Sequence, residues 1–98
     1  GFNVYPKEIE TVIDEIDGVI ESAVIGVAHL DFGEAVVAVI VRNDDSLSED
    51  DVIGAIKGQL ANFKVPKRVF FLSELPRNAM GKVQKNILRE DYKTIFSN

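Results

Sequence analysis

The sequence has no cysteine and no tryptophan, and it contains a single histidine, His29. Without cysteine the chain can form neither a disulfide nor a thiolate metal site, and its composition is compatible with a reducing compartment. One histidine cannot build a metal site or a catalytic triad by itself. Its surroundings, AHLDFGE, are typical of a turn between strands, where we expect a solvent-facing histidine. No metal site is therefore predicted.

Long apolar runs are also absent. The longest spans residues 35–41, far fewer than the roughly 18 residues that a helix needs to cross a bilayer. We therefore expect a soluble chain with no membrane partner. The sequence begins at Gly1 without an initiator methionine or a signal-like segment, and we expect it to be a piece of a longer protein.

The composition is that of one small folded domain covering residues 1–98, with 46% hydrophobic and 28% charged residues. Charge is distributed unevenly. Residues 1–56 carry two basic side chains against thirteen acidic ones, whereas residues 57–98 carry nine basic and three acidic side chains. A basic half favours an anionic ligand, although scattered solvated lysines would give the same count.

Apolar spacing predicts helices at both ends of the chain. In the stretch VYPKEIETVIDEIDG, Pro6 suits a first turn and Gly18 a C-terminal stop. A terminal amphipathic helix is expected from about residue 86, with its apolar side formed by Ile87, Leu88, Tyr92 and Ile95.

A third helix is predicted over residues 49–60. Ser48 is the expected N-cap, and Asp51 stands where a capping box usually has glutamate. Gly54 and Gly58 weaken such a helix by roughly 1 kcal/mol each relative to alanine. We expect these two glycines to permit close packing.

Three segments have the apolar or β-branched character of strands: residues 19–28, 34–42 and 68–72. The second is apolar throughout and should lie at the centre of the sheet. A short turn makes the first two an antiparallel hairpin. The fold class predicted is α+β, a small mixed sheet of about three main strands with flanking helices.

The stretch PRNAMGK, which Pro76 opens a few residues after the last predicted strand, is predicted to be a loop that meets an anion. Gly81 removes steric bulk so that the backbone can approach a ligand, and Lys82 supplies a compact cation. We expect the residues before Gly81 to be irregular and flexible. The loop is no phosphate-binding P-loop, because Val83 occupies the place of the magnesium-binding hydroxyl. Taken alone, Gly-Lys is better explained by a surface turn than by a binding site.

Three stretches taken together point to a family. GFNVYPKEIE at the start, LANFKVPK at residues 60–67 and LPRNAMGKVQKNILR at residues 75–89 resemble, in order and spacing, the C-terminal domain of adenylate-forming enzymes. That family contains acyl-CoA synthetases, luciferases and the adenylation domains of peptide synthetases. The resemblance covers essentially the whole chain. Within the family, the wording is most similar to malonyl-CoA synthetases.

The resemblance implies a two-step reaction. A carboxylic acid and Mg-ATP give an acyl-adenylate and pyrophosphate, and the thiol of coenzyme A then displaces AMP. ATP, Mg and the small acid are expected to bind mainly to a large N-terminal domain outside this chain, which acts as that domain's lid and is inactive when isolated. The family also implies a cytoplasmic protein.

The resemblance assigns roles to five residues. Lys82 matches the family's adenylation lysine and is the predicted catalytic residue, with Gly81 supporting its loop. Gly1 matches a glycine that lies against the pantetheine tunnel during thioester formation, and Phe2 and Asn3 follow it on the coenzyme A face.

Further basic residues receive no role. Five of them are expected to be solvated surface residues, although they could meet the phosphates of coenzyme A: Lys64, Lys67, Arg68, Arg77 and Lys85. Lys82 also lies in the proline, four residues, glycine, lysine context that resembles the target of a lysine acetyltransferase in bacterial members of the family. Acetylation would remove its charge.

Two alternatives remain open. One is an adenylation domain that passes its acyl group to the pantetheine of a carrier protein. The other is a non-enzymatic anion-binding module. Nucleic acid is not an expected partner, because aromatic residues are not interleaved with basic ones and the net charge is −5.

Overall fold

The sheet is organised around β2 (Gly33–Arg42), whose residues 35–41 are all buried. The structure is a computed structural model that describes residues 4–97. In it, β2 pairs antiparallel with β1 (Val19–His29) and parallel with β3 (Arg68–Phe71). The predictions of a central apolar strand and an antiparallel hairpin are confirmed.

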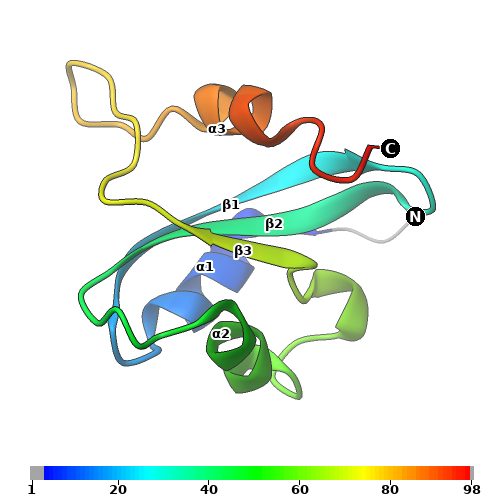
Figure 1. Cartoon of the computed structure of the whole chain (residues 1–98), viewed down its shortest axis with the longest axis horizontal. Coiled ribbons are helices and arrows are strands. Elements are labelled where there is room, and N and C mark those ends of the chain that lie inside the picture. The colour runs from blue at the N-terminus through cyan, green and yellow to red at the C-terminus, as the bar shows by residue number, and fades with distance from the viewer. Residues whose placement is uncertain (1–3, 98) are drawn as a thin grey trace.

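Helices cover both faces of the sheet, as the burial of both faces of β2 requires. Within residues 4–97 there are three α-helices. Figure 1 shows α1 (Pro6–Asp14) and α2 (Glu49–Ile56) on one face and α3 (Lys85–Tyr92) on the other. A short 3-10 helix, η1 (Asn62–Lys64), precedes β3. The α+β prediction is confirmed.

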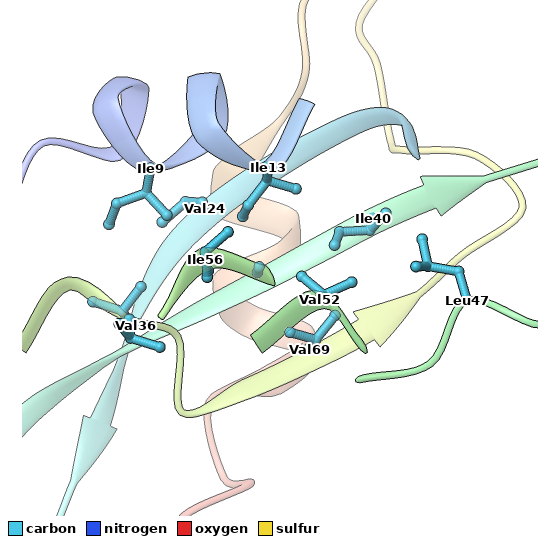
Figure 2. Close-up of a cluster of buried hydrophobic side chains, with 11 residues drawn as sticks. Ile9, Ile13, Val24, Val36, Ile40, Leu47, Val52, Ile56 and Val69 are labelled. Atoms are coloured by element: carbon cyan, nitrogen blue, oxygen red, sulfur yellow. The ribbon is translucent and has the colours of Figure 1, made fainter. Parts of the chain in front are cut away.

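The side chains of β2 alternate between two hydrophobic clusters, one on each face of the sheet. The cluster under α1 and α2 (Figure 2) consists of Ile9, Ile13, Val24, Val36, Ala38, Ile40, Leu47, Val52, Ile56, Val65 and Val69. The cluster under α3 consists of Ala23, Ile25, Val27, Val37, Val39, Val41, Leu75 and Leu88. One strand therefore supplies both cores.

The start of α2 has the predicted capping box. The N–H of Asp51 donates to Oγ of Ser48 at 3.1 Å, and the N–H of Ser48 donates to Oδ2 of Asp51 at 3.0 Å. The shorter acid thus accepts the N–H of the N-cap residue, as glutamate usually does in a capping box.

The end of α2 differs from the prediction. The helix ends at Ile56 rather than Leu60, because Lys57 leaves the helical conformation at ψ 132° and Gly58 has φ +91°. A Cβ atom added at Gly54 or Gly58 would meet no atom within 4 Å. The expectation that these glycines permit close packing is therefore wrong, and Gly58 instead provides a backbone conformation that other residues rarely adopt.

Three smaller expectations also fail. The first helix ends at Asp14 and not near Gly18. Ile87 is 42% exposed instead of facing the core, while its neighbour Leu88 is fully buried. His29 is the last residue of β1 and is partly buried, with its ring 4.5 Å from that of Phe32 and 4.9 Å from that of Phe96.

The outer edge of β3 is protected by Glu49, the first residue of α2. Its Oε2 accepts a hydrogen bond from the N–H of Val69 at 2.7 Å and lies 2.8 Å from Nε of Arg68. Partial burial raises the pKa of this carboxyl, but the bonds from Val69 and Arg68 outweigh it, and the net pKa lies below the ordinary value. The ionised carboxylate of Glu49 therefore accepts a hydrogen bond from the N–H of Val69, which β2 leaves unpaired at the outer edge of β3.

This interaction predicts a pH dependence. Because the folded pKa of Glu49 is lowered, its stabilising contribution is present above the ordinary value of 4.5 and is lost as the pH falls through the folded value. Urea unfolding of wild type should therefore lose stability below about pH 4.5 more steeply than Glu49→Gln. Asp50→Asn, on the exposed neighbour, should behave like wild type. Equal slopes for wild type and Glu49→Gln would contradict the assignment.

Leu88 and Ile87 are neighbours on α3 that differ in burial, and they provide a matched pair of variants. Leu88→Ala should lower the free energy of unfolding by about 2–5 kcal/mol, the usual cost of truncating a buried leucine. Ile87→Ala, one position earlier and half exposed, should cost much less. Denaturant titration of both variants measures the difference, and similar losses would show that α3 is rotated from the orientation described.

Candidate functional site

Lys82 lies on a hydrogen-bonded hairpin between β3 and α3. Arg77 and Val83 form an antiparallel bridge, and the N–H of Gln84 donates to the carbonyl of Pro76 at 2.8 Å. Figure 1 shows this segment, drawn from yellow to orange, projecting beyond the sheet on the α3 side. We call residues 76–84 the Lys82 hairpin.

Asn78 holds the turn of the Lys82 hairpin together. Its Oδ1 atom accepts hydrogen bonds from the N–H groups of Met80 at 3.0 Å and of Lys82 at 2.9 Å. Its own N–H donates to the carbonyl of Lys82 at 3.0 Å, and its carbonyl accepts from the N–H of Gly81 at 2.9 Å. A side-chain bond to the backbone two residues on is the typical turn chemistry of asparagine.

Arg77 connects the turn to the sheet. Its Nη1 donates to the carbonyl of Gly81 at 2.6 Å, and its Nη2 forms an ion pair with Glu21 near the start of β1. The guanidinium has several donors in a fixed plane and can therefore bridge two acceptors. The residue before Lys82 is thus tied to an edge strand.

The backbone of the Gly81-Lys82 pair is fully satisfied, while the lysine side chain is exposed. All four backbone polar groups of these two residues bond to Arg77 or Asn78. Within residues 4–97 the Lys82 ammonium has no hydrogen bond or ion pair. The expectation of an irregular loop is wrong, because the hairpin is hydrogen bonded through its turn.

Gly81 has a conformational reason to be glycine. Its φ is +84°, and a Cβ atom there would meet nothing within 4 Å, so space is not limiting within this chain. Other residues pay a steric penalty at such φ values. The turn therefore selects glycine regardless of any approach to a ligand.

A second contact fixes the far end of the hairpin. Lys85, the first residue of α3, places Nζ 2.7 Å from Oε2 of Glu10 on α1. The same Oε2 accepts the N–H of Val24 on β1 at 2.8 Å. The carboxylate of Glu10 therefore joins both helices to the edge strand.

The other predicted site residues, Gly1, Phe2 and Asn3, lie outside the described residues. The next residue, Val4, lines a pocket of about 740 Å³ together with Gly26 and Phe63. This pocket is on the α1 face of the sheet, whereas the Lys82 hairpin is tied to Glu21 on β1 and emerges on the α3 face. The structure therefore separates the pocket from Lys82.

Two of the basic residues expected to be solvated have partners beside this pocket. Nζ of Lys64 lies 2.8 Å from Oε1 of Glu8 on α1. Nζ of Lys67 lies 4.6 Å from the ring centre of Phe32, a cation–π contact. These two ammonium groups are thus engaged within the domain.

Residues 4–97 form neither a cluster of metal ligands nor a membrane-spanning helix. No three His, Asp or Glu side chains come close enough to hold a metal ion, so none of the described residues is assigned as a Mg²⁺ ligand. In the same range, no helix combines the length and apolar character of a membrane span.

Sequence reasoning missed the three residues that hold the hairpin. Asn78 carried a readable signal, because asparagine often accepts the N–H two residues later in a turn. The pair of Arg77 and Glu21 carried none, since 56 residues separate its members. Only the folded chain brings them together.

Comparisons with known proteins agree on one family. A sequence profile of the AMP-binding enzyme C-terminal domain matches residues 8–82. A methyl-dioxo-octahydro-indenyl-propanoyl:CoA ligase from Rhodococcus jostii is 53% identical over 94 residues, which cover 95% of this chain and 18% of that protein. The long-chain-fatty-acid–CoA ligase FadD13 of Mycobacterium tuberculosis is 44% identical over 92 residues, covering 94% and 18%.

Solved structures give the same result. ATP-bound MatB from Rhodopseudomonas palustris superposes with a TM-score of 0.96 at 60% identity, covering 99% of this chain and 20% of that one. The amide bond synthetase McbA from Marinactinospora thermotolerans gives a TM-score of 0.85 at 33% identity, covering 93% and 19%. The chain thus spans about a fifth of the length of the proteins it matches.

Proposed function

Because the chain belongs to the AMP-binding enzyme C-terminal domain family, we propose that it is the C-terminal lid of an AMP-forming acyl-CoA ligase. In the first half-reaction, a carboxylate oxygen attacks the α-phosphorus of ATP and the bond to pyrophosphate breaks. In the second, the sulfur of coenzyme A attacks the acyl carbon, the thiol gives up its proton, and AMP leaves. The identity to acyl-CoA ligases supports this reaction.

The observation that carries the proposal is the arrangement at Lys82, whose backbone is fixed while its ammonium remains exposed and without a partner in the described chain. Attack of a carboxylate on a phosphate brings two anions together. A cation that touches both oxygens lowers this repulsion, and does so most where negative charge develops. We assign this role to Lys82 in the first half-reaction.

The large N-terminal domain expected from the family would hold ATP, the acid and Mg²⁺. Bound Mg²⁺ would neutralise phosphate charge, and the described residues of this chain contribute no group of ligands to it. What this chain brings to the nucleotide is the Lys82 ammonium, presented beyond the edge of its own fold. The isolated domain should therefore be inactive.

Thioester formation would use the other side of the domain. We assign Gly1, Phe2 and Asn3 to the face that meets the pantetheine arm of coenzyme A. Their neighbour Val4 lines the pocket on the α1 face, away from Lys82. Because Val4 and the Lys82 hairpin lie on different faces of the sheet, we infer that the lid rotates between the half-reactions.

The proposed acid is malonate or a related small acid. The support is the resemblance of GFNVYPKE and LPRNAMGKVQKN to malonyl-CoA synthetases, together with an identity to MatB of 60%, which exceeds the identity to FadD13 in the same domain. The acid pocket itself is expected in the N-terminal domain.

A different acceptor is the second candidate. McbA shares this domain at 33% identity, and its name describes amide bond formation rather than ligation to coenzyme A. The carboxylate could then pass from the adenylate to an amine or to a carrier-protein pantetheine. Formation of an acyl-CoA from free coenzyme A by the full-length protein distinguishes these acceptors.

Lys82 is also the proposed target of a lysine acetyltransferase. Lys82 is exposed, and Met80 in the same turn is 92% exposed. This exposure supports access by a modifying enzyme. Acetylation removes the charge that the first half-reaction needs.

The role of Lys82 is tested by separating the half-reactions in the full-length enzyme. Lys82→Ala should slow carboxylate-dependent pyrophosphate release by about 10²- to 10³-fold, the usual cost of losing one group that stabilises transition-state charge. Conversion of supplied acyl-adenylate and coenzyme A into thioester should be nearly unchanged. The two rates are measured in separate assays on the same preparations.

Gly1→Trp provides the mirror-image control. A bulky side chain at the coenzyme A face should obstruct thioester formation and spare pyrophosphate release. Equal losses in both assays for Lys82→Ala would contradict its role, and a loss confined to pyrophosphate release for Gly1→Trp would contradict the assignment of the coenzyme A face.

A further inference from the structure

We propose that Arg77 and Asn78, anchored through Glu21 on β1, are positioning residues that set the place of the Lys82 ammonium for the first half-reaction. This inference rests on the role proposed for Lys82. None of these three side chains needs to touch a substrate. They act through the backbone of Gly81 and Lys82.

Hydrogen bonds satisfy the whole backbone of the Gly81-Lys82 pair. Asn78 binds both the N–H and the carbonyl of Lys82, at 2.9 and 3.0 Å. Its side-chain oxygen also binds the N–H of Met80 at 3.0 Å. Removing Oδ1 therefore leaves two exposed N–H groups without their partner, and the turn loses its main constraint.

Arg77 links the turn of the hairpin to the sheet. Its guanidinium bonds to the carbonyl of Gly81 at 2.6 Å and pairs with the Glu21 carboxylate. Arg77 thus connects the turn to β1, which pairs with the buried strand β2 along its length. The bond fixes the orientation of the peptide unit that joins Gly81 to Lys82.

A fixed backbone matters for Lys82 because its side chain is long and flexible. The side chain has four rotatable bonds and no partner among the described residues, so the chain itself does not hold the ammonium. Its position relative to a substrate is then limited by where its backbone lies. Misplacement of a reacting group by 1 Å costs about 10²-fold in rate.

The ion pairs around the hairpin involve the basic neighbours of Lys82 and not Lys82 itself. Glu21 pairs with Arg77, and Glu10 pairs with Lys85 at 2.7 Å. The two basic residues that flank Lys82 therefore have acidic partners. Within the described part of the hairpin, Lys82 alone keeps its positive charge available for an anion.

The test uses the full-length enzyme and three substitutions at two positions. Asn78→Leu removes the acceptor at similar size, Asn78→Ser keeps a neutral acceptor oxygen, and Arg77→Gln removes the ion pair. Pyrophosphate release and thioester formation from supplied adenylate are both measured, together with KM for ATP and the thermal unfolding midpoint. Arg89→Gln, which removes an exposed cation from α3, is the matched control.

We expect Asn78→Leu to lower kcat for pyrophosphate release by about 10²-fold with little change in KM for ATP. Thioester formation and the unfolding midpoint should stay near wild type, and Asn78→Ser should recover most of the lost rate. Arg77→Gln should lose rate in the same assay only. Arg89→Gln should match wild type in both assays.

Two outcomes overturn the inference while leaving the proposed function intact. One is wild-type pyrophosphate release by Asn78→Leu and Arg77→Gln in an enzyme whose Lys82→Ala variant has lost it. The other is an equal fall in both half-reactions, which would indicate a general structural role. If Lys82→Ala itself keeps full pyrophosphate release, the proposed function fails and this inference fails with it.

A double-mutant cycle tests the link to β1 separately. If Glu21 acts through Arg77, Glu21→Ala and Arg77→Ala should each slow pyrophosphate release, and the double variant should be no slower than Arg77→Ala. Multiplicative losses would show that Glu21 does not act through Arg77. Asp17→Asn, an exposed acid in the turn before β1, should leave the rate unchanged.

Discussion

The burial of β2 on both faces is the constraint on which the rest of the fold depends. Its residues alternate between a core under α1 and α2 and a core under α3, so helices are required on both sides of the sheet, which has three strands within residues 4–97. Both neighbouring strands are then edges, and each has a helix glutamate bound to a backbone N–H, Glu10 at Val24 and Glu49 at Val69. The edge contact of Glu10 also reaches Lys85.

This architecture explains how a net-acidic domain presents a usable cation on the Lys82 hairpin. The chain between β3 and α3 must cross from the sheet to the opposite core, and it does so as the Lys82 hairpin. Acidic residues on β1 and α1 pair with the basic residues on either side of Lys82, which leaves the backbone of that lysine fixed and its ammonium exposed. The overall charge of −5 is therefore a poor guide to the chemistry of this loop.

Local patterns in the sequence predicted much of this fold. The apolar run of β2, the capping box at Ser48 and the turn signal at Gly81 each depend on neighbouring residues, and each is present in the structure. What the sequence did not reveal depends on distant residues. Ile87 fits a helical apolar stripe as well as Leu88 does, and only the packing of α3 distinguishes them. The contact between Arg77 and Glu21 likewise exists only because β1 passes beside the hairpin.

The most direct test of the account is acid-dependent pyrophosphate release by the full-length protein with ATP and no coenzyme A, measured across malonate, methylmalonate and acetate. The account predicts release that depends on the acid and is fastest with malonate, followed by acyl-CoA formation once coenzyme A is added. Pyrophosphate release that is the same with and without every acid would contradict it, because the domain would then have the fold of an adenylate-forming enzyme without the chemistry assigned to Lys82.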